Sequence, residues 1–326
     1  MNRLVVRVRA VGGPDVLEVE EDAAPLPGPG EVQLTQTAIG LNFLDTYQRS
    51  GLYPMPLPFV PGSEGAGVVS AIGAGVDEAL LGRRVAYAGV LGAYASVRTL
   101  PAERVVPLPD GLSDLLAAAM MLKGMTAEYL VRRLHVVQPR EVVVVHAAAG
   151  GVGQLLCQWA SHLGATVIGV VGSEAKAAIA RRCGAQHVVV TPGQSLVDEV
   201  KRLTGGRGVD VVYDSVGKAT LDASLDALKA RGLLVSFGQS SGMPAPLSLA
   251  ALGGARSLFV TRPSLHAYVH TRAELEASAS ALFDVVTRGV VTVAEPTRFS
   301  LRDVAAAHRA LEGRQTTGSV VLVPSA

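Results

Sequence analysis

Apolar residues in the middle of the chain occur in short β-branched runs, separated by amphipathic segments that end near a glycine. Such runs are typical of parallel strands buried on both faces, and a glycine after the last turn commonly ends a helix. The pattern predicts strands at 142–145, 166–171, 187–190, 209–213 and 233–237, and helices at 152–163, 174–182, 196–203 and 219–229. Residues 125–262 are therefore expected to form an α/β domain with a doubly wound parallel sheet.

The two ends of the chain have a different pattern of apolar and polar residues. Residues 1–124 contain short alternating runs between Pro/Gly turns, which favours a compact, mostly β unit, and the Arg/Val alternation at the N-terminus predicts a first strand rather than a signal peptide. After residue 262 we expect a helix at 272–288, a strand at 290–293, a helix at 301–312 and a strand at 320–323. This tail is expected to complete the first domain, giving domains of 1–124 with 263–326 and of 125–262.

One segment has the length of a membrane span. Residues 142–173 contain no Asp, Glu, Lys or Arg. The segment nevertheless consists of a β-branched run, a glycine cluster, an amphipathic stretch and a second β-branched run, which two buried strands around a helix explain better. No membrane association is expected.

Charge and composition narrow the function classes. The 326 residues include 29 Lys plus Arg against 28 Asp plus Glu, a net charge of +1, and only 17% are charged. The electrostatic footprint of nucleic-acid binding or of polybasic membrane attachment is missing. The two cysteines, Cys157 and Cys183, are too few for a disulfide scaffold or a Cys-rich metal lobe. A globular protein of the reducing cytoplasm is expected.

The most informative local motif lies at residues 141–154, where a strand, a glycine turn and a helix start follow one another. Compared with the dinucleotide-binding fingerprint, Ala148 occupies the first glycine position, Gly150 the second and Gly153 the third. Gly150 would let the backbone approach a pyrophosphate, and the helix amides would point at the anion. The alternative is a tight structural turn that binds no ligand.

The end of the second strand favours NADPH over NADH. An acid there would accept hydrogen bonds from the ribose hydroxyls, whereas a cation accommodates a 2'-phosphate. The strand ends at Gly172 and Ser173, and Lys176 lies one turn into the next helix. Glu174, an acid directly after the strand end, argues against the preference for NADPH. The alternative for Lys176 is an ordinary solvated helix residue that binds no phosphate.

Metal and hydrolase chemistry have no support in the sequence. A catalytic zinc needs three protein ligands, but the histidines are scattered, and the i, i+4 pair His266 and His270 has no surrounding His-Glu-x-x-His pattern. No Gly-x-Ser-x-Gly elbow occurs. We expect no bound metal.

The segment AIGLNFLDTYQRSGLY at residues 38–53 resembles the quinone oxidoreductases, the zeta-crystallin branch of the zinc-free medium-chain dehydrogenases/reductases. Further matching blocks span nearly the whole chain in order: 61–67, 122–126, 146–153, 213–217, 237–242, 261–265 and 314–319. Zinc-dependent relatives carry Gly-His-Glu where this chain has Gly62, Ser63 and Glu64, and the cysteine ligands are missing too.

The resemblance implies a GroES-like catalytic domain built from both chain ends, a Rossmann domain in the middle, and NADPH between them. It places Asn42, Tyr47 and Tyr53 at the nicotinamide and quinone end. It implies further cofactor contacts at Thr126, Tyr129, Ala149, Gly150, Gly151, Val152, Gly153, Gly172, Ser173, Lys176, Ser215, Phe237, Gly238, Gln239, Ser240, Arg262 and Arg314. A homodimer is also implied, and an edge strand near residues 257–260 would serve it.

Two departures from the family pattern bear on the cofactor. Thr191 stands where relatives often carry a Tyr for the adenosine phosphate, which weakens the expected NADPH preference, and Gln239 replaces an Asn. Two candidates also have an alternative structural role. Tyr53 could pack beside Pro54, and Asn42 could cap a helix that begins at Phe43.

The expected activity is hydride transfer from NADPH to a quinone without a metal. Asn42, Tyr47 and Tyr53 would donate hydrogen bonds to the oxygen that becomes negative, and Tyr53 or solvent would supply the proton. The alternatives are an NADPH-dependent reductase of enones or enoyl thioesters, and a non-catalytic NADPH-binding protein of crystallin-like or RNA-associated type.

Overall fold

The computed structural model describes residues 2–324 and divides them into two compact units. Unit 1 contains residues 2–125, 269–287 and 293–324, and unit 2 contains residues 126–268 and 288–292. Each unit has its own main sheet and its own hydrophobic core. The sequence placed the second boundary at residue 262, whereas residues 263–268 stay with unit 2, where the Tyr268 ring stacks on Tyr129 with centroids 4.2 Å apart.

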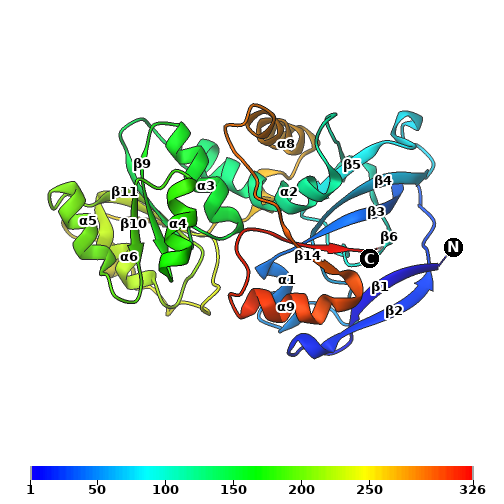
Figure 1. The fold of residues 1–326 in the computed structure, drawn as a ribbon, viewed down its shortest axis with the longest axis horizontal. Helices are drawn as coiled ribbons and strands as arrows, with labels where there is room; N and C mark the ends of the chain where they lie inside the picture. The colour runs from blue at the N-terminus through cyan, green and yellow to red at the C-terminus, as the bar shows by residue number, and fades with distance from the viewer. Residues whose placement is uncertain (1, 325–326) are drawn as a thin grey trace. The chain divides into compact units, whose positions relative to one another are not determined.

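Unit 2 is a six-stranded parallel sheet between helices (Figure 1). The strand order is β10-β9-β8-β11-β12-β13. The chain adds β9 and β10 on one side of β8 and then returns to add β11, β12 and β13 on the other side, as in doubly wound folds. Helices α3 and α4 pack on one face, and α5 and α6 pack on the other. The strands are β8 (Val142–His146), β9 (Thr166–Val171), β10 (His187–Val190), β11 (Val209–Asp214), β12 (Leu228–Ser236) and β13 (Phe259–Thr261), and the helices are α3 (Gly151–His162), α4 (Glu174–Arg182), α5 (Leu196–Thr204), α6 (Leu221–Ala227) and α7 (Leu265–Tyr268).

The β-branched runs form the strands because both sheet faces are covered. All six residues of β11 are buried, and Val143, Val144 and Val145 of β8 have no exposed surface. The segment that has the length of a membrane span is β8, the 12-residue α3 and β9. Within residues 2–324, no helix combines the length and apolarity that crossing a bilayer requires.

Unit 1 is built on a mixed sheet with the order β14-β15-β3-β4-β5-β7, and β6 also pairs with β3. The tail of the chain joins this sheet, because β15 pairs antiparallel with β3 and parallel with β14. The elements are β1 (Asn2–Val8), β2 (Leu17–Ala23), β3 (Glu31–Leu41), α1 (Phe43–Arg49), β4 (Glu64–Ile72), β5 (Arg84–Ala88), β6 (Val97–Pro101), β7 (Val106–Pro107), α2 (Asp114–Tyr129, which continues into unit 2), α8 (Arg272–Thr287), β14 (Thr297–Ser300), α9 (Val304–Glu312) and β15 (Val320–Val323).

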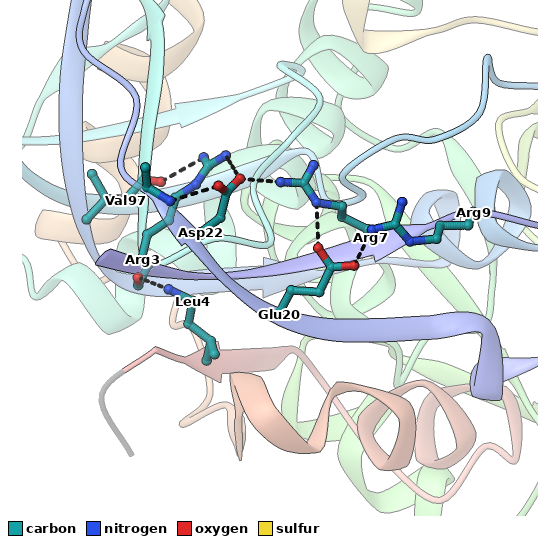
Figure 2. A network of polar contacts seen from close by, with 9 residues as sticks. Arg3, Leu4, Arg7, Arg9, Glu20, Asp22 and Val97 are labelled. Carbon is teal, nitrogen blue, oxygen red and sulfur yellow. Dashed lines mark hydrogen bonds and ion pairs between the residues drawn. The ribbon is translucent and has the colours of Figure 1, made fainter. Parts of the chain in front are cut away.

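The predicted Arg/Val alternation of the first strand places the arginines on the polar face of the β1–β2 hairpin (Figure 2). Arg7 Nε donates to Glu20 Oε2 at 2.9 Å, and Arg9 Nη2 donates to Glu20 Oε1 at 2.6 Å. Arg3 Nη1 donates to the carbonyl of Val97 at 3.1 Å, which ties the hairpin to β6. Because most of these side chains are partly or largely exposed, each ion pair contributes little stability.

Two predicted elements differ from the structure. The strand expected at residues 290–293 is wrong: Gly289, with φ of +69°, follows the end of α8, and the strand lies at β14 instead. The backbone N–H and C=O of Thr292 are satisfied by the Gln158 side chain at 2.8 and 3.0 Å rather than by a neighbouring strand. The helix expected at 219–229 ends at Ala227, because Leu228 pairs with Val209 as the first residue of β12.

Candidate functional site

Most of the candidate nucleotide-binding residues lie at one edge of the unit 2 sheet. The strands of this sheet are parallel, so their carboxyl ends meet there, where α/β proteins bind ligands. The residues are Ala149, Gly150, Gly151, Val152 and Gly153 after β8, Gly172, Ser173 and Lys176 after β9, Ser215 after β11, Phe237, Gly238, Gln239 and Ser240 after β12, and Arg262 after β13.

The glycine turn after β8 is shaped for an anion. Gly150 is the N-cap of α3, and its N–H donates to the carbonyl of Ala147 at 2.8 Å. A Cβ on Gly153 would lie 2.2 Å from that same oxygen, so a glycine is needed for the helix to start this close to the strand. The first-turn amides of α3 have no acceptor within the helix and carry the positive end of its dipole. This arrangement fits the pyrophosphate of a dinucleotide.

Ala148, which replaces the first glycine of the fingerprint, is compensated in the neighbouring strand. Its N–H donates to the carbonyl of Val170 at 3.1 Å, which holds the turn against β9. A Cβ on Gly169 of β9 would lie 2.9 Å from the Ala148 Cβ. The methyl group of Ala148, which a glycine at this position would lack, therefore fits because β9 has Gly169 opposite it.

The end of β9 forms an open, acid-free strand tip. Ser173 is the N-cap of α4, and its Oγ accepts a hydrogen bond from the Lys176 N–H at 3.4 Å. The nearest atom to a Cβ on Gly172 would be the carbonyl oxygen of Thr191, 3.9 Å away. The Thr191 hydroxyl points back to the carbonyl of Val171 at 3.4 Å. These groups have room and polarity for a 2'-phosphate.

The loops after β11, β12 and β13 are joined to one another. The Ser240 N–H donates to the carbonyl of Ser215 at 3.1 Å, and a Cβ on Gly238 would lie 2.7 Å from that oxygen. Arg262 Nη2 donates to Gln239 Oε1 at 2.7 Å. The structure therefore brings these predicted residues together.

Two further cofactor candidates, Thr126 and Tyr129, lie on the last turn of α2 and not at a strand end. Both are buried, with 7% and 1% of their surface exposed. Burial raises the pKa of Tyr129, and its ring is stacked on Tyr268. The stacking gives Tyr129 a structural role whatever else it contacts.

The remaining candidates, Asn42, Tyr47, Tyr53 and Arg314, belong to unit 1. Asn42 is the N-cap of α1, as its structural alternative predicted. The rings of Tyr47 and Tyr53 meet edge to face with centroids 5.4 Å apart, and the Tyr53 N–H donates to the Tyr47 carbonyl at 3.0 Å. Arg314 follows α9 with a φ of +57°.

Sequence reasoning missed the buried polar groups around Asn42. Asn42 Nδ2 donates to Glu64 Oε1 at 2.8 Å, and Lys123 Nζ lies 2.5 Å from the same oxygen. The Asn42 N–H donates to Asp45 Oδ2 at 2.9 Å. The available signal was a single lysine in an apolar helix, since a lysine on a buried face needs an anion.

A directed hydrogen-bond chain ends at Asp45. Arg49 has only donors, so its contact with His308 Nδ1 at 3.1 Å makes Nδ1 an acceptor and places the imidazole hydrogen on Nε2. Nε2 then donates to the Tyr94 hydroxyl at 3.0 Å, and Tyr94 donates to Asp45 Oδ2 at 3.0 Å. Burial and the charge of Arg49 lower the pKa of His308 to about 3, which keeps the ring neutral. Glu312 balances Arg49 through two bonds of 2.7 and 3.0 Å.

Comparison with known proteins identifies the family. Residues 151–278 match the zinc-binding dehydrogenase family, and residues 28–110 match the alcohol dehydrogenase GroES-like domain. A quinone oxidoreductase of Salmonella typhimurium is 50% identical over 317 residues, which cover 96% of this chain and 97% of that protein. The chain belongs to the quinone oxidoreductase family.

Other relatives of this quinone oxidoreductase family member extend the comparison. A 2-haloacrylate reductase of Burkholderia sp. is 47% identical over 324 residues, with 97% of both chains covered. The crystal structure of Escherichia coli quinone oxidoreductase complexed with NADPH matches with a TM-score of 0.96 at 46% identity, covering 98% of this chain and all of that chain. The expected family, the α/β class and the GroES-like and Rossmann parts are confirmed.

Ser63, where the resemblance expects a histidine ligand in zinc-dependent relatives, is 3% exposed. In the part of the chain that the structure describes, no three His, Cys, Asp or Glu side chains form a group able to hold a metal ion.

Proposed function

We propose that this protein is an NADPH-dependent quinone reductase. The observation that carries the proposal is the glycine turn at the head of a parallel sheet, in a chain that matches an NADPH-complexed quinone oxidoreductase over 98% of its length. NADPH, when bound, supplies the hydride, and the protein supplies binding, orientation and electrostatics.

The proposed binding roles follow the geometry of unit 2. The turn at Ala149 and Gly150 would approach the pyrophosphate, and the amides of Gly151, Val152 and Gly153 would hold it. Gly172, Ser173 and Lys176 would hold the 2'-phosphate. Further contacts within unit 2 would come from Thr126, Tyr129, Ser215, the loop of Phe237, Gly238, Gln239 and Ser240, and Arg262. Arg314 of unit 1 is proposed as a cofactor contact from the family resemblance alone.

The substrate end of the site is proposed at Asn42, Tyr47 and Tyr53. The two tyrosine rings give a quinone an aromatic surface, and their hydroxyls can donate to an oxygen that gains negative charge. We propose that catalysis needs no zinc, because Ser63 offers a poor ligand where a histidine is required.

A second candidate activity is reduction of an activated alkene. It is favoured by the 47% identity to the Burkholderia 2-haloacrylate reductase. The same hydride donor serves both reactions, so the acceptor decides between them.

A substrate panel tests the proposal. Purified protein is treated with a chelator, and oxidation of NADPH and NADH is followed with 1,4-benzoquinone, 9,10-phenanthrenequinone, an enone and 2-chloroacrylate. NADPH-selective quinone turnover that survives chelation is expected. Turnover only with the enone or 2-chloroacrylate would assign alkene reduction, and NADPH binding without turnover would assign a non-catalytic role.

The assembly and compartment are also proposals. Strand β13 lies at the edge of its sheet with Phe259 60% and Val260 36% exposed, which suits an edge-to-edge homodimer. Sedimentation equilibrium of the wild type and of Phe259→Lys tests the dimer. Two free cysteines, Cys157 and Cys183, suit the reducing cytoplasm.

A further inference from the structure

A buried ion pair lies beside the start of α1. Glu64 opens β4 with a fully buried side chain, and Lys123 of α2 is 5% exposed. Their Nζ and Oε1 atoms are 2.5 Å apart. Taking two charges out of water costs several kcal/mol per ion, and apolar replacements of such a pair are often neutral or stabilising. Stability alone therefore explains this pair poorly.

Three donors hold the Glu64 carboxylate in one orientation. Oε1 accepts from Lys123 and from Asn42 Nδ2 at 2.8 Å, and Oε2 accepts from the Leu122 N–H at 2.7 Å. A Cβ on Gly40 would lie 2.3 Å from Oε1, so the neighbouring strand has no side chain where the carboxylate passes. The surroundings are built to bring this carboxylate to Asn42.

The same contacts fix the carboxamide of Asn42. An ionised carboxylate only accepts hydrogen bonds, so the amide must turn its nitrogen toward Glu64. Its oxygen then faces the Asp45 N–H in the capping box of α1, and its second N–H is directed away from the pair. A protonated Glu64 could also donate, and the Asn42 amide could then turn over and bond through its oxygen instead.

We propose that Lys123 and Glu64 are positioning residues for Asn42: the lysine charge keeps Glu64 an acceptor, and Glu64 holds the Asn42 amide in the orientation used at the substrate end. The inference rests on the proposed function, which gives Asn42 its place there. The carboxylate also polarises the amide, which strengthens the hydrogen bonds that the other polar atoms of the amide make.

Other titratable groups near Glu64 set the reference for a pH experiment. They are Asp45 of α1, Tyr87 of β5 and Tyr94. Burial raises the pKa of both tyrosines, which stay protonated at neutral pH. Burial also raises the pKa of Asp45 to about 7, so the wild-type profile, which contains Asp45, is the baseline for every variant.

The kinetic test uses Lys123→Met, with Lys123→Arg as the conservative variant. Lys123→Met removes the positive charge 2.5 Å from Glu64 Oε1, and a nearby positive charge favours the acceptor-only form of a carboxyl group. We expect kcat of Lys123→Met with 9,10-phenanthrenequinone to fall at least tenfold at pH 6, with little change in KM, and to recover as the pH rises. Lys123→Arg should keep the wild-type profile. Lys229→Met, which breaks the ion pair with Asp210 in unit 2, is the matched control and should change neither value.

A second readout needs neither cofactor nor substrate. In the ligand-free protein, the two side-chain N–H signals of Asn42 in a nitrogen-15 spectrum should shift with pH in Lys123→Met with a midpoint that the wild type lacks. Glu64→Gln, which can donate or accept at every pH, should lower kcat without a pH midpoint and serves if Lys123→Met fails to fold.

The outcomes separate the two proposals. A uniform loss of kcat in Lys123→Met at all pH values, or an Asn42 amide that titrates as in the wild type, would overturn the positioning role. If none of the tested acceptors supports NADPH oxidation by the wild type, the proposed function is overturned. The titration of the Asn42 amide would still decide the inference.

Discussion

Replacing Asp45 by asparagine isolates the energetic cost of one buried carboxyl. Asp45 has no exposed surface, and its Oδ2 accepts from the Asn42 N–H and the Tyr94 hydroxyl. Its Oδ1 makes no hydrogen bond within the described residues. An asparagine oxygen can accept the same two bonds, so Asp45→Asn removes mainly the ability to ionise.

The magnitude follows from the pKa. Burial raises the pKa of Asp45 from 3.8 to about 7, against the opposing effect of its two hydrogen-bond donors. The folded protein therefore binds this proton more tightly than the unfolded chain, and the stability that the protonated carboxyl provides is lost as the pH rises from about 4 through about 7. At about 1.4 kcal/mol per tenfold change in proton affinity, the full loss is about 4 kcal/mol, of which about 2.5 kcal/mol falls between pH 5 and pH 8.

The assay is urea unfolding of wild type and Asp45→Asn at pH 5, 6, 7 and 8, with hydrogen exchange of β4 amides to monitor unit 1 separately. The pH-independent cost of the new amide is the same at each pH and cancels from the trend. Relative to the wild type, the variant should gain about 2.5 kcal/mol of unfolding free energy from pH 5 to pH 8.

Asp210→Asn is the control of opposite sign. Burial acts to raise the pKa of Asp210, but hydrogen bonds from Lys229 and from the Val142 N–H outweigh it and lower the pKa. The stability provided by Asp210 is therefore present throughout pH 5 to pH 8 and is lost only below about pH 4, so Asp210→Asn should differ from the wild type by a constant amount across the assay and approach it when the series is extended to pH 3. A free-energy difference for Asp45→Asn that stays constant from pH 5 to pH 8, as expected for Asp210→Asn, or that changes in favour of the wild type as the pH rises, would refute the reasoning.

Three further substitutions test separate parts of the structure. Gly153→Ala, whose Cβ would meet the turn's backbone at 2.2 Å, should weaken NADPH binding at least tenfold by calorimetry, whereas Gly253→Ala, with no atom nearer than 3.7 Å, should not. Lys176→Ala should raise the dissociation constant for NADPH about tenfold and leave that for NADH unchanged, and equal changes for both would remove Lys176 from the 2'-phosphate site. Gly40→Ala, whose Cβ would lie 2.3 Å from Glu64 Oε1, should destabilise the protein by about 2 kcal/mol in urea unfolding, and an unchanged midpoint would contradict the tight contact.

The parallel sheet could be predicted because its strands carry a local signal. Each β-branched run, such as the one that forms β8, is followed by a glycine-marked turn, and both faces must be buried. The run at residues 290–293 has the same length as the runs at 142–145 and 187–190, so the local signal alone does not distinguish it from a strand. Its outcome depended on Gln158, more than 130 positions away, whose side chain takes the hydrogen bonds that a neighbouring strand would have taken.

The candidate site was predictable to the same extent as the sheet. Residues that follow parallel strands must meet at one edge, so the order of strands along the sequence is enough to group Ser173, Ser215 and Arg262. The contacts of Glu64 with Asn42 and with Lys123 join positions that are 22 and 59 residues apart in unit 1. Register in that unit depends on bulges in the pairing of β3 with β4, which the sequence pattern does not indicate.

Two buried carboxyl groups with different electrostatic surroundings, Glu64 and Asp45, both contact Asn42. Glu64 contacts its side chain and has the Lys123 charge at 2.5 Å, whereas Asp45 contacts its backbone and receives only neutral donors from Tyr94 and Asn42. The cation Arg49 reaches Asp45 only through His308 and Tyr94, and its own charge is balanced by Glu312. A change of activity near neutral pH in the wild type would therefore report the ionisation of Asp45, and a change that appears only when Lys123 is removed would report the loss of the contact between Lys123 and Glu64.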